Sequence, residues 1–525
     1  MTARTLARAG MVVTAAFFVS RLLGYVRLIV ITNTFGASAD LDAYFAAFRL
    51  PDTIFQLVAA GALGSALIPV LAGLFTHGED DRAWRVVSTV LNFMLLLLIA
   101  FSIIVAIWAP LIVPLITPGF DVVNTELTVR LTRTMLLSPI LLALGAVASS
   151  VLNARGRFGA AAIAPSVYNL AIIGGAIFLA PYMGVYALAV GVVIGSLLHL
   201  LVQLPPVISE RFRFNFGIEL SDSAARQSLL LMLPRAFGLG AAQITFIVNT
   251  VLATGIGVGA VTAYNVAFNI LQIPLGLIGI PLGVVLLPSM SRAVAAGSVG
   301  EFGRLIVRSL RLLLYIMIWI TIVGMVERRQ VVAVLFGGGF DARGVSLTAD
   351  TLLFFMIGLP AHAMIVVLAR AFYSGQDTRT PVIAAILSVG VNVIISIATV
   401  GALGLSGLAL GIAVGAWFEA ILLAVLLWQR TPGAGIETIV GPGINYLAGS
   451  AFSAAAAFAV LRLLEPVFGL EPGRLLTFVE VVVASSAAAL VYVLYSVITR
   501  IPELGLSISL LRSALRRGPP SAPAP

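Results

Sequence analysis

Long apolar runs follow one another along almost the whole chain, and only short connectors separate them. A helix that crosses a lipid bilayer needs roughly 20 apolar residues, and by that measure about 14 segments qualify. They lie near residues 9–33, 43–75, 86–115, 127–152, 160–180, 185–207, 228–254, 261–289, 304–325, 350–372, 381–401, 404–428, 440–463 and 475–498. Because lipid offers no partner for exposed backbone N–H and C=O groups, such segments must be helical. The pattern predicts an all-α polytopic membrane protein with about 14 transmembrane helices.

The composition agrees with a membrane protein and excludes other classes. Of the 525 residues, 60% are hydrophobic and 10% are charged, which is far from the usage of soluble globular domains. The net charge of +9 comes from arginines scattered in the connectors, which suits anionic lipid headgroups rather than nucleic acid. The chain has no cysteine, so it can form neither a disulfide nor a thiolate metal site. Since no catalytic motif is found either, we expect no enzyme activity, metal or cofactor.

Basic connectors alternate with connectors that are poor in basic residues. By the positive-inside tendency the basic connectors face the cytoplasm, and an even number of spans places both termini there as well. The arginines of this set are Arg4, Arg8, Arg82, Arg85, Arg155, Arg157, Arg211, Arg213, Arg226, Arg292, Arg304, Arg308, Arg379, Arg430, Arg500, Arg512, Arg516 and Arg517. The two longest connectors are predicted at 208–227 and 326–349, and the second departs from the alternation because it holds Arg328, Arg329 and Arg343.

The sequence repeats itself at an offset of 220 residues. AYFAAF at 43–48 returns as AYNVAF at 263–268, and five residues of the segment 184–195 recur in 404–415. Chance similarity of apolar sequence is the alternative, but two separate blocks with one offset weigh against it. We predict two six-helix bundles with the same orientation, an arrangement that transporters use for alternating access. The predicted parts are an N-lobe at 1–215, a C-lobe at 216–432, helices 13 and 14 at 433–500, and a cytoplasmic tail at 501–525.

Two arginines interrupt the first apolar segment. An arginine at the centre of a bilayer costs roughly 2.5–3.5 kcal/mol on insertion scales, so such residues usually face a protein interior or water. On one helix, Arg21 and Arg27 lie on either side of Gly24, which leaves a notch between them. For Arg21, reaching outward to the lipid headgroups is an equally good interpretation. Arg27 is predicted to face a cavity.

The second apolar segment adds further charges. Arg49 lies several residues inside this segment and is predicted to face the same cavity, whereas Asp42 is predicted at its outer end with a mainly structural role. The corresponding stretch of the second half has the neutral Asn269. A cavity between the halves would therefore be cationic on one side and suit an anionic ligand. Pro51 and the small residues 59–65 are predicted points of flexing.

Six stretches then stand in a specific order and spacing. They are SRLLGYVR, FGASADLDAYFAAFRLP, GALGSALIPVL, RFGAAAIAPSVYNL, LLPSMSR and FYSGQDTRTPV. Together they resemble the MurJ (MviN) lipid II flippases of the multidrug/oligosaccharidyl-lipid/polysaccharide (MOP) exporter superfamily, over nearly the whole chain. The resemblance implies a bacterial inner-membrane flippase that moves the undecaprenyl-pyrophosphate-linked peptidoglycan precursor, lipid II, from the inner to the outer leaflet. It assigns binding roles to Arg21, Arg27, Asp42 and Arg49.

The chain departs from this family at three charged cavity positions. Neutral residues stand there, namely Phe55 or Gln56, Ala60 and Asn269. The predicted substrate-binding residues are Arg21, Gly24, Arg27, Asp42, Arg49 and Asn269, and membrane lipids and the lipid-linked anion are the expected partners. Two alternatives stay open: export of another lipid-linked oligosaccharide or of a drug, and a non-transporting scaffold that contacts cell-wall synthesis proteins.

Overall fold

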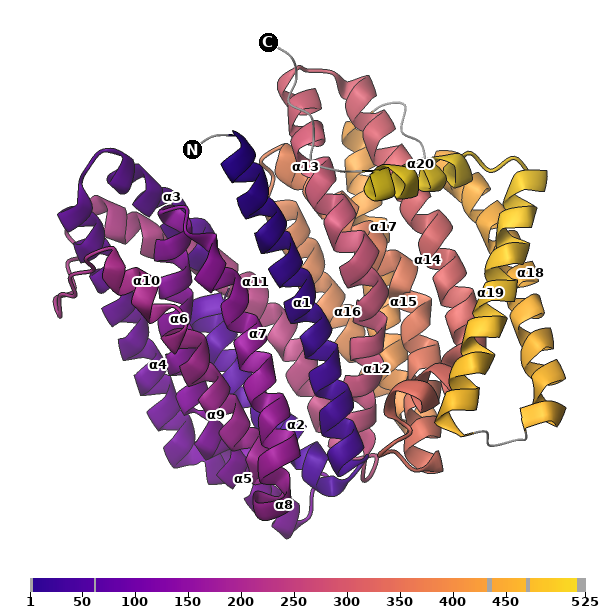
Figure 1. Cartoon of the computed structure of the whole chain (residues 1–525), viewed down its shortest axis with the longest axis horizontal. Helices are drawn as coiled ribbons and strands as arrows, with labels where there is room; N and C mark the ends of the chain where they lie inside the picture. Colours follow the sequence, from indigo (N-terminus) through magenta and orange to yellow (C-terminus); the bar gives the residue numbers. More distant parts are fainter. Residues whose placement is uncertain (1–2, 61–62, 432–436, 469–472, 517–525) are drawn as a thin grey trace. The chain divides into compact units, whose positions relative to one another are not determined.

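The structure is a computed structural model, and it describes residues 3–60, 63–431, 437–468 and 473–516. Side chains are described for 15–59, 66–232, 236, 239–431, 438–467 and 473–509. Every element in the described ranges is a helix (Figure 1). The elements are α1 (Ala3–Phe35), α2 (Ala39–Phe55), η1 (Gln56–Ala60), α3 (Leu63–Thr76), α4 (Asp80–Ile116), α5 (Val122–Met135), α6 (Leu137–Ala154), α7 (Phe158–Gly174), η2 (Gly175–Leu179), α8 (Ala180–Met183), α9 (Tyr186–Leu201), α10 (Leu204–Ser209), α11 (Ser223–Thr254), α12 (Ala260–Pro274), η3 (Leu275–Gly279), α13 (Ile280–Ala295), α14 (Val299–Phe336), α15 (Ala342–Ser374), α16 (Arg379–Leu403), α17 (Leu405–Arg430), α18 (Glu437–Phe468), α19 (Arg474–Ile498) and α20 (Pro502–Arg516).

The helices confirm a multi-span, all-α protein. Within the described residues, 12 helical stretches are long and apolar enough to cross a membrane. Two shorter apolar helices, Ala66–Thr76 and Leu239–Thr254, accompany them. The predicted number of 14 spans is therefore not confirmed by length and composition. The second predicted span, 43–75, contains α2, the π-helix η1 and α3 in succession.

One sequence-based expectation about a connector is wrong. The predicted loop 326–349 is largely helical, because α14 continues to Phe336 and α15 begins at Ala342. Its charges are accommodated inside the fold: Glu327 is buried and accepts a hydrogen bond from Ser485 Oγ at 2.6 Å, and Arg328 Nη1 donates to Met325 O at 2.7 Å. The predicted tail 501–525 begins with a further helix, α20.

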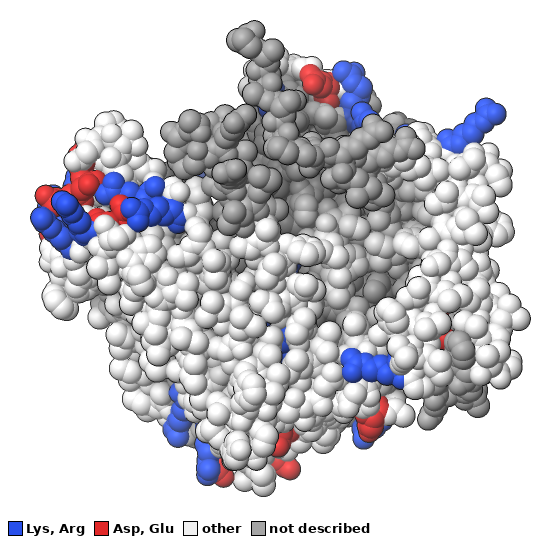
Figure 2. Space-filling model, in the orientation of Figure 1, with Lys and Arg blue, Asp and Glu red and all other residues white. Residues whose placement is uncertain are grey.

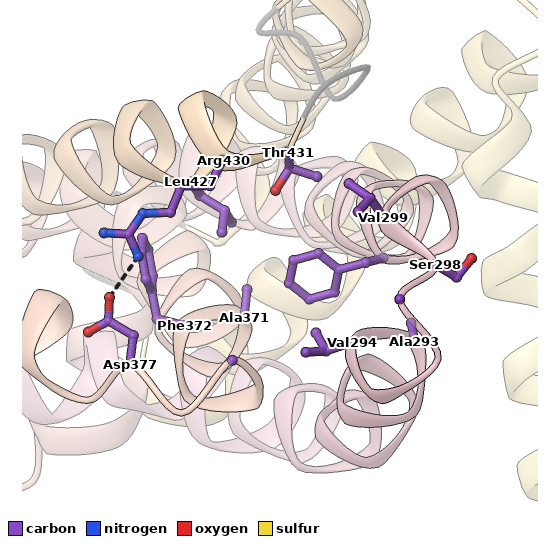
Figure 3. Close-up of a pocket in the computed structure, with 13 residues that line it drawn as sticks. Ala293, Val294, Ser298, Val299, Ala371, Phe372, Asp377, Leu427, Arg430 and Thr431 are labelled. Carbon is purple, nitrogen blue, oxygen red and sulfur yellow. Dashed lines mark hydrogen bonds and ion pairs between the residues drawn. The ribbon is translucent and has the colours of Figure 1, made fainter.

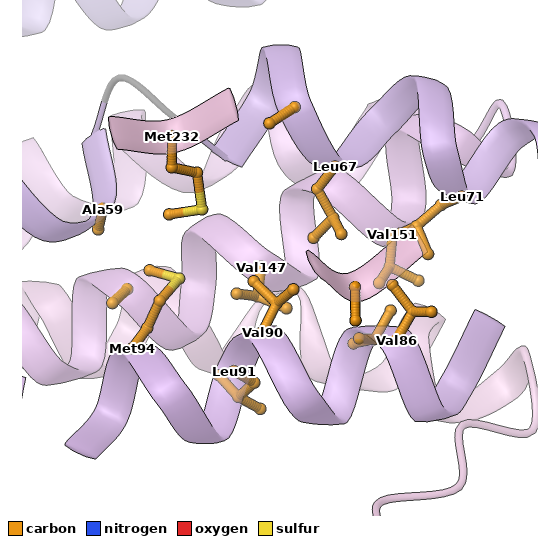
Figure 4. Close-up of a cluster of buried hydrophobic side chains, with 14 of the residues drawn as sticks. Ala59, Leu67, Leu71, Val86, Val90, Leu91, Met94, Val147, Val151 and Met232 are labelled. Atoms are coloured by element: carbon orange, nitrogen blue, oxygen red, sulfur yellow. The ribbon is translucent and has the colours of Figure 1, made fainter. Parts of the chain in front are cut away.

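The chain forms two compact units. Unit 1 comprises Met1–Val266 and Gly339–Gly344, and unit 2 comprises Ala267–Gly338 and Val345–Pro525. Unit 1 thus includes α11 and the first turns of α12, beyond the predicted end of the N-lobe at residue 215. An apolar core of this unit joins α3, α4, α6 and α11 through side chains such as Leu67, Val90, Val147 and Met232 (Figure 4).

Charged side chains of unit 1 gather at its two ends. In Figure 2 they cluster beside α3 and again below α5 and α8, and the face between these clusters is mostly uncharged. At the α3 end, Arg82 Nε lies 2.8 Å from Asp222 Oδ2, and this hydrogen-bonded guanidinium lowers the pKa of the Asp222 carboxyl. An uncharged belt between two charged ends is what a lipid environment requires.

Backbone irregularities recur at the offset of the sequence repeat. Gly184 ends one helix with φ 57° and ψ −141°, and Gly404, 220 residues later, has φ 55° and ψ −132°. Gly156 has φ 74°, and the residue 220 positions later, Gln376, has φ 61°. The π-helices η1 and η3 begin 219 residues apart, at Gln56 and Leu275. Since these departures from regular helix are rare, their shared spacing supports a structural repeat.

In unit 2, hydrogen bonds attach α18 and α19 to α14. Trp319 Nε1 donates to Ser453 Oγ at 2.8 Å, and Ser453 Oγ donates to Ala488 O at 2.6 Å, so that one chain of bonds crosses all three helices. Tyr492 OH donates to Tyr315 O at 2.8 Å, and the two tyrosine rings stack with centroids 4.9 Å apart. The last two spanning helices are thus fixed by polar contacts as well as by apolar packing.

Candidate functional site

Unit 1 contains a cavity of about 500 Å³ that opens among α1, α2, α6, α7 and α9. Polar side chains occupy a large part of its wall, in a protein that is otherwise mostly apolar. They include Arg27, Asp52, Gln56, Asn153, Tyr168 and His199. Because polar groups inside membrane helices usually line water-filled paths, this cavity is the candidate binding site.

Arg27 is the cationic residue of this wall. It lies on α1, which is held against α7 by a hydrogen bond from Asn169 Nδ2 to Ser20 O at 3.2 Å. The Arg27 guanidinium carbon lies 5.9 Å from the centroid of the Tyr168 ring, so a cation–π contact orients it. Among the described side chains, no carboxylate lies within ion-pair distance of Arg27. The guanidinium is therefore available to an anionic group that enters the cavity.

Asp52 supplies the opposite charge in the same wall. Gln56 Nε2 donates to Asp52 Oδ1 at 3.4 Å, and Gln243 Nε2 of α11 donates to Oδ2 at 3.3 Å. Asp52 and Gln56 are four residues apart and share one face of the helix, a spacing that is visible in the sequence. Sequence reasoning missed both as site residues. It also missed Tyr168, Asn153 and His199.

Arg49 binds protein groups through two of its three guanidinium nitrogens. Its Nη2 donates to Asn265 Oδ1 at 2.5 Å, its Nε donates to Thr250 Oγ1 at 3.2 Å, and its guanidinium lies 5.1 Å from the centroid of the Phe246 ring. These contacts tie α2 to α11 and to the start of α12. Arg49 is not among the residues that line the 500 Å³ cavity.

Asp42 is buried, with 1% of its surface exposed, and it caps the N-terminus of α12. Its Oδ2 accepts a hydrogen bond from Gly259 N at 2.6 Å. Its Oδ1 accepts from Thr262 N at 2.7 Å and from Thr262 Oγ1 at 2.6 Å. The first N–H groups of a helix have no partner within the helix, so a carboxylate from α2 satisfies them. These contacts tie α2 to the start of α12, and Asp42 does not line the cavity.

The other sequence-predicted residues lie in different surroundings. Arg21 is exposed on α1, and a methyl group added to Gly24 would meet no atom within 4 Å, so the notch next to it is open. Phe55 stands at or next to a position where the resemblance implies a charged residue, and it lines the cavity next to Gln56. Asn269 is partly buried on α12 in unit 2. The side chain of Ala60 lies outside the described ones.

A second cavity, of about 270 Å³, lies in unit 2 (Figure 3). It is lined mainly by apolar side chains, and one ion pair closes one side: Arg430 Nη1 lies 2.8 Å from Asp377 Oδ2. The residues 220 positions earlier, Arg157 and Glu210, also form an ion pair, with Nε and Oε1 2.6 Å apart. The two halves thus share a pair at the same positions with the charges exchanged. Since the Arg430 guanidinium is already paired with Asp377, this cavity is a weaker candidate for an anion site.

In the part of the chain that the structure describes, no group of three or more His, Asp or Glu side chains could hold a metal ion. The polar groups of the first cavity are suited to hydrogen bonding and charge pairing with a ligand.

Comparison with known proteins gives consistent matches in sequence. A family model described as lipid II flippase MurJ matches residues 31–495. The chain is similar to the lipid II flippase MurJ of Burkholderia cenocepacia, with 34% identity over 435 residues that cover 81% of this chain and 84% of the relative. It is also similar to the probable lipid II flippase MurJ of Rhizobium meliloti, with 32% identity over 513 residues, 95% of this chain and 94% of the relative.

Solved structures match the fold. A structure of the lipid II flippase MurJ in an inward closed conformation has a TM-score of 0.78 and 22% identity, and the match covers 93% of this chain and 99% of that one. An inward-facing multidrug resistance MATE family transporter of the MOP superfamily has a TM-score of 0.66 and 17% identity, over 81% of this chain and 98% of that one. The multi-span helical fold, the repeat and the matched residues lead to one conclusion. This chain belongs to the lipid II flippase MurJ family.

Proposed function

We propose that this chain flips lipid II across the bacterial inner membrane by alternating access, with Arg27 as the residue that binds the pyrophosphate. Membership of the lipid II flippase MurJ family supports the substrate. The observation that carries the role of Arg27 is its guanidinium, which lines a polar cavity without a carboxylate partner within ion-pair distance among the described side chains. Both termini are proposed to lie in the cytoplasm, in accordance with the positive-inside tendency.

The chemistry of the ligand suits this cavity. A pyrophosphate presents clustered oxygens with negative charge, and a guanidinium binds such oxygens with two parallel hydrogen bonds. Tyr168 and Asn153 line the same wall and can donate further hydrogen bonds. The carboxylate of Asp52 repels phosphate, so an anion in the cavity would be directed towards the Arg27 side. Burial strengthens each of these interactions relative to water.

The other predicted residues are proposed either to contact the ligand or to position the helices. Arg21 and Gly24 lie on α1 in the two turns before Arg27, where a cation and an open notch favour the rest of an anionic headgroup. Arg49 and Asp42 act as positioning residues, because their contacts fix α2 to α11 and α12. Asn269 is proposed to contribute a neutral contact from the second half. Proteins of cell-wall synthesis are proposed as partners of the transporter.

The test is lipid II binding to purified protein in which Arg27 is replaced. Removal of a charged hydrogen-bonding group costs about 1.5–3 kcal/mol, so Arg27→Ala should weaken binding by about 10- to 150-fold. Arg27→Lys keeps the charge but not the paired hydrogen bonds, and it should lie between Arg27→Ala and the wild type. Arg213→Ala is the matched control, because Arg213 lies on an exposed connector with 77% of its side chain accessible.

The same experiment separates the alternatives. Undiminished binding by a folded Arg27→Ala protein would remove the role assigned to that residue. Tighter binding of a polyprenyl pyrophosphate that carries another oligosaccharide, or of a cationic drug, would replace lipid II as the substrate. If the wild-type chain inserts normally but does not restore growth of cells depleted of their flippase, the scaffold function takes precedence.

A further inference from the structure

Unit 2 has a basic groove that the transport cavity does not explain. Its volume is about 850 Å³, and α14 and α20 form its two long walls, with the start of α18 beside them. The wall from α14 carries Arg304, Arg308 and Arg311, and the wall from α20 carries Glu503 and Leu506. All of these residues belong to one compact unit, so the groove is a feature of that unit alone.

The three arginines form a single row along α14. Their spacing of four and three residues places them on one face of the helix. Arg304 and Arg308 are exposed, and among the described side chains neither has an acidic partner within ion-pair distance. Two like charges four residues apart repel each other, so a bound anion between them would relieve that repulsion. Glu301, at the rim of the groove, offsets only part of this positive charge.

Arg311 has a different function in the row. Its Nε lies 2.7 Å from Oε1 of Glu503, whose side chain is only 8% exposed. This ion pair attaches α20 to α14 directly after the last spanning helix. The groove is therefore built by a fixed wall, and the pairing leaves Arg304 and Arg308 as its available cations.

The position of α20 indicates the kind of ligand. In Figure 1, α20 runs across α14 near the ends of α18 and α19, and it contacts α14 and α19. It presents apolar side chains there: Leu506 lines the groove, and Ile508 is 42% exposed. A helix that lies across the ends of membrane spans with exposed apolar side chains is typical of the lipid–water interface. A ligand in this groove would thus meet guanidiniums at one end and apolar groups at the other.

We propose that this groove binds the phosphate headgroup of an anionic glycerophospholipid, with Arg304 and Arg308 as the donors. Guanidiniums bind phosphate oxygens with paired hydrogen bonds, and basic residues next to a membrane attract anionic lipids. The acyl chains would run along the apolar side of α20 into the bilayer. The bound lipid would join α14 to α20 and so stabilise the end of unit 2. This proposal does not depend on lipid II transport.

The test measures phospholipid binding to the delipidated full-length protein by native mass spectrometry. Phosphatidylglycerol is the probe, phosphatidylcholine the zwitterionic comparison, and inorganic phosphate the soluble competitor. Wild-type protein should retain phosphatidylglycerol at least about 10-fold more tightly than phosphatidylcholine, as expected for two basic contacts. Arg304→Gln/Arg308→Gln should abolish this preference, and Arg304→Lys/Arg308→Lys should keep most of it because the charge remains.

The control removes two arginines elsewhere. Arg213→Gln/Arg226→Gln removes the same amount of charge from unit 1, where Arg213 lies on the connector before α11 and Arg226 lies in the first turn of α11. This variant should leave the lipid preference unchanged. An equal loss in this control would overturn the proposal, because net charge would then explain the binding. Displacement of phosphatidylglycerol by an equal concentration of inorganic phosphate would also overturn it. Lipid II binding should be unaffected by Arg304→Gln/Arg308→Gln, which keeps this result separate from the test of Arg27.

Discussion

Replacement of Asp42 should release the first turn of α12 from α2. The carboxylate accepts three hydrogen bonds in a buried position, two of them from the backbone N–H groups of Gly259 and Thr262. In Asp42→Ala both N–H groups lose their acceptor, and each unsatisfied buried donor costs about 1–3 kcal/mol. The hydroxyl of Thr262 can turn to another acceptor, so its loss adds little. The expected destabilisation of this junction is about 2–6 kcal/mol.

Amide hydrogen exchange measures this effect at the bonds concerned. Exchange of a protected amide reports the free energy of local opening, so a loss of 3 kcal/mol raises the exchange rate by about 150-fold. The peptide that covers residues 257–265 should show this acceleration in Asp42→Ala. Asp42→Asn should show a smaller acceleration. The asparagine oxygen can still accept one hydrogen bond, whereas its NH2 group faces an N–H donor and cannot replace the second carboxylate oxygen.

The matched control is Asp40→Asn, two residues earlier on the exposed side of α2. This variant should leave exchange in 257–265 unchanged, since Asp40 lies outside the capping contacts. Exchange in Asp42→Ala within twofold of the wild type would refute the capping argument. It would mean that packing alone holds the α11–α12 turn in place.

Two further predictions concern the turn between α15 and α16 and its counterpart between α6 and α7. Hydrogen bonds from Thr380 N, Arg430 and Thr380 Oγ1 lower the pKa of the Asp377 carboxyl to about 2, below its ordinary 3.8. The stabilisation that the ionised carboxylate provides is therefore complete above about pH 4 and is lost as the pH falls towards 2. Acid unfolding should show this loss in the wild type and not in Asp377→Asn. Gln376 has a φ of 61° and Gly156 a φ of 74°, a region that costs a non-glycine residue about 1–2 kcal/mol. Thermal unfolding should therefore show a gain for Gln376→Gly and a loss for Gly156→Gln, and equal melting temperatures would contradict this reasoning.

Hydropathy located the spanning helices because the bilayer imposes a length and a polarity on each of them. The same criterion missed α20, since a helix at an interface needs only one apolar side and has a low average hydropathy. It also ended the ninth span too early. Glu327 and Arg328 resemble connector residues in the sequence, but Ser485, 158 positions away, binds the carboxylate inside the fold.

The sequence could indicate which single residues belong to the candidate site, but it could not indicate their distant partners. The cost of a buried arginine pointed to Arg27, and the structure places that residue in a polar cavity. The same argument could not foresee that Arg49 binds Asn265, because the two are 216 positions apart. Asp42 likewise meets Thr262 across 220 positions. A cost argument shows that a charge needs a partner, and only the fold decides whether that partner is a ligand or the protein.

The hydrogen bonds that join α14, α18 and α19 affect how firmly these helices associate in a lipid bilayer. Lipid tails solvate leucine and valine about as well as a neighbouring helix does, so apolar contact alone gives two helices little reason to stay together. Trp319 with Ser453 and Tyr492 with Tyr315 supply contacts that hydrocarbon cannot replace. The hairpin of α18 and α19 should therefore stay attached to α14 and not separate from it within the bilayer, even where its lipid-facing side chains are apolar.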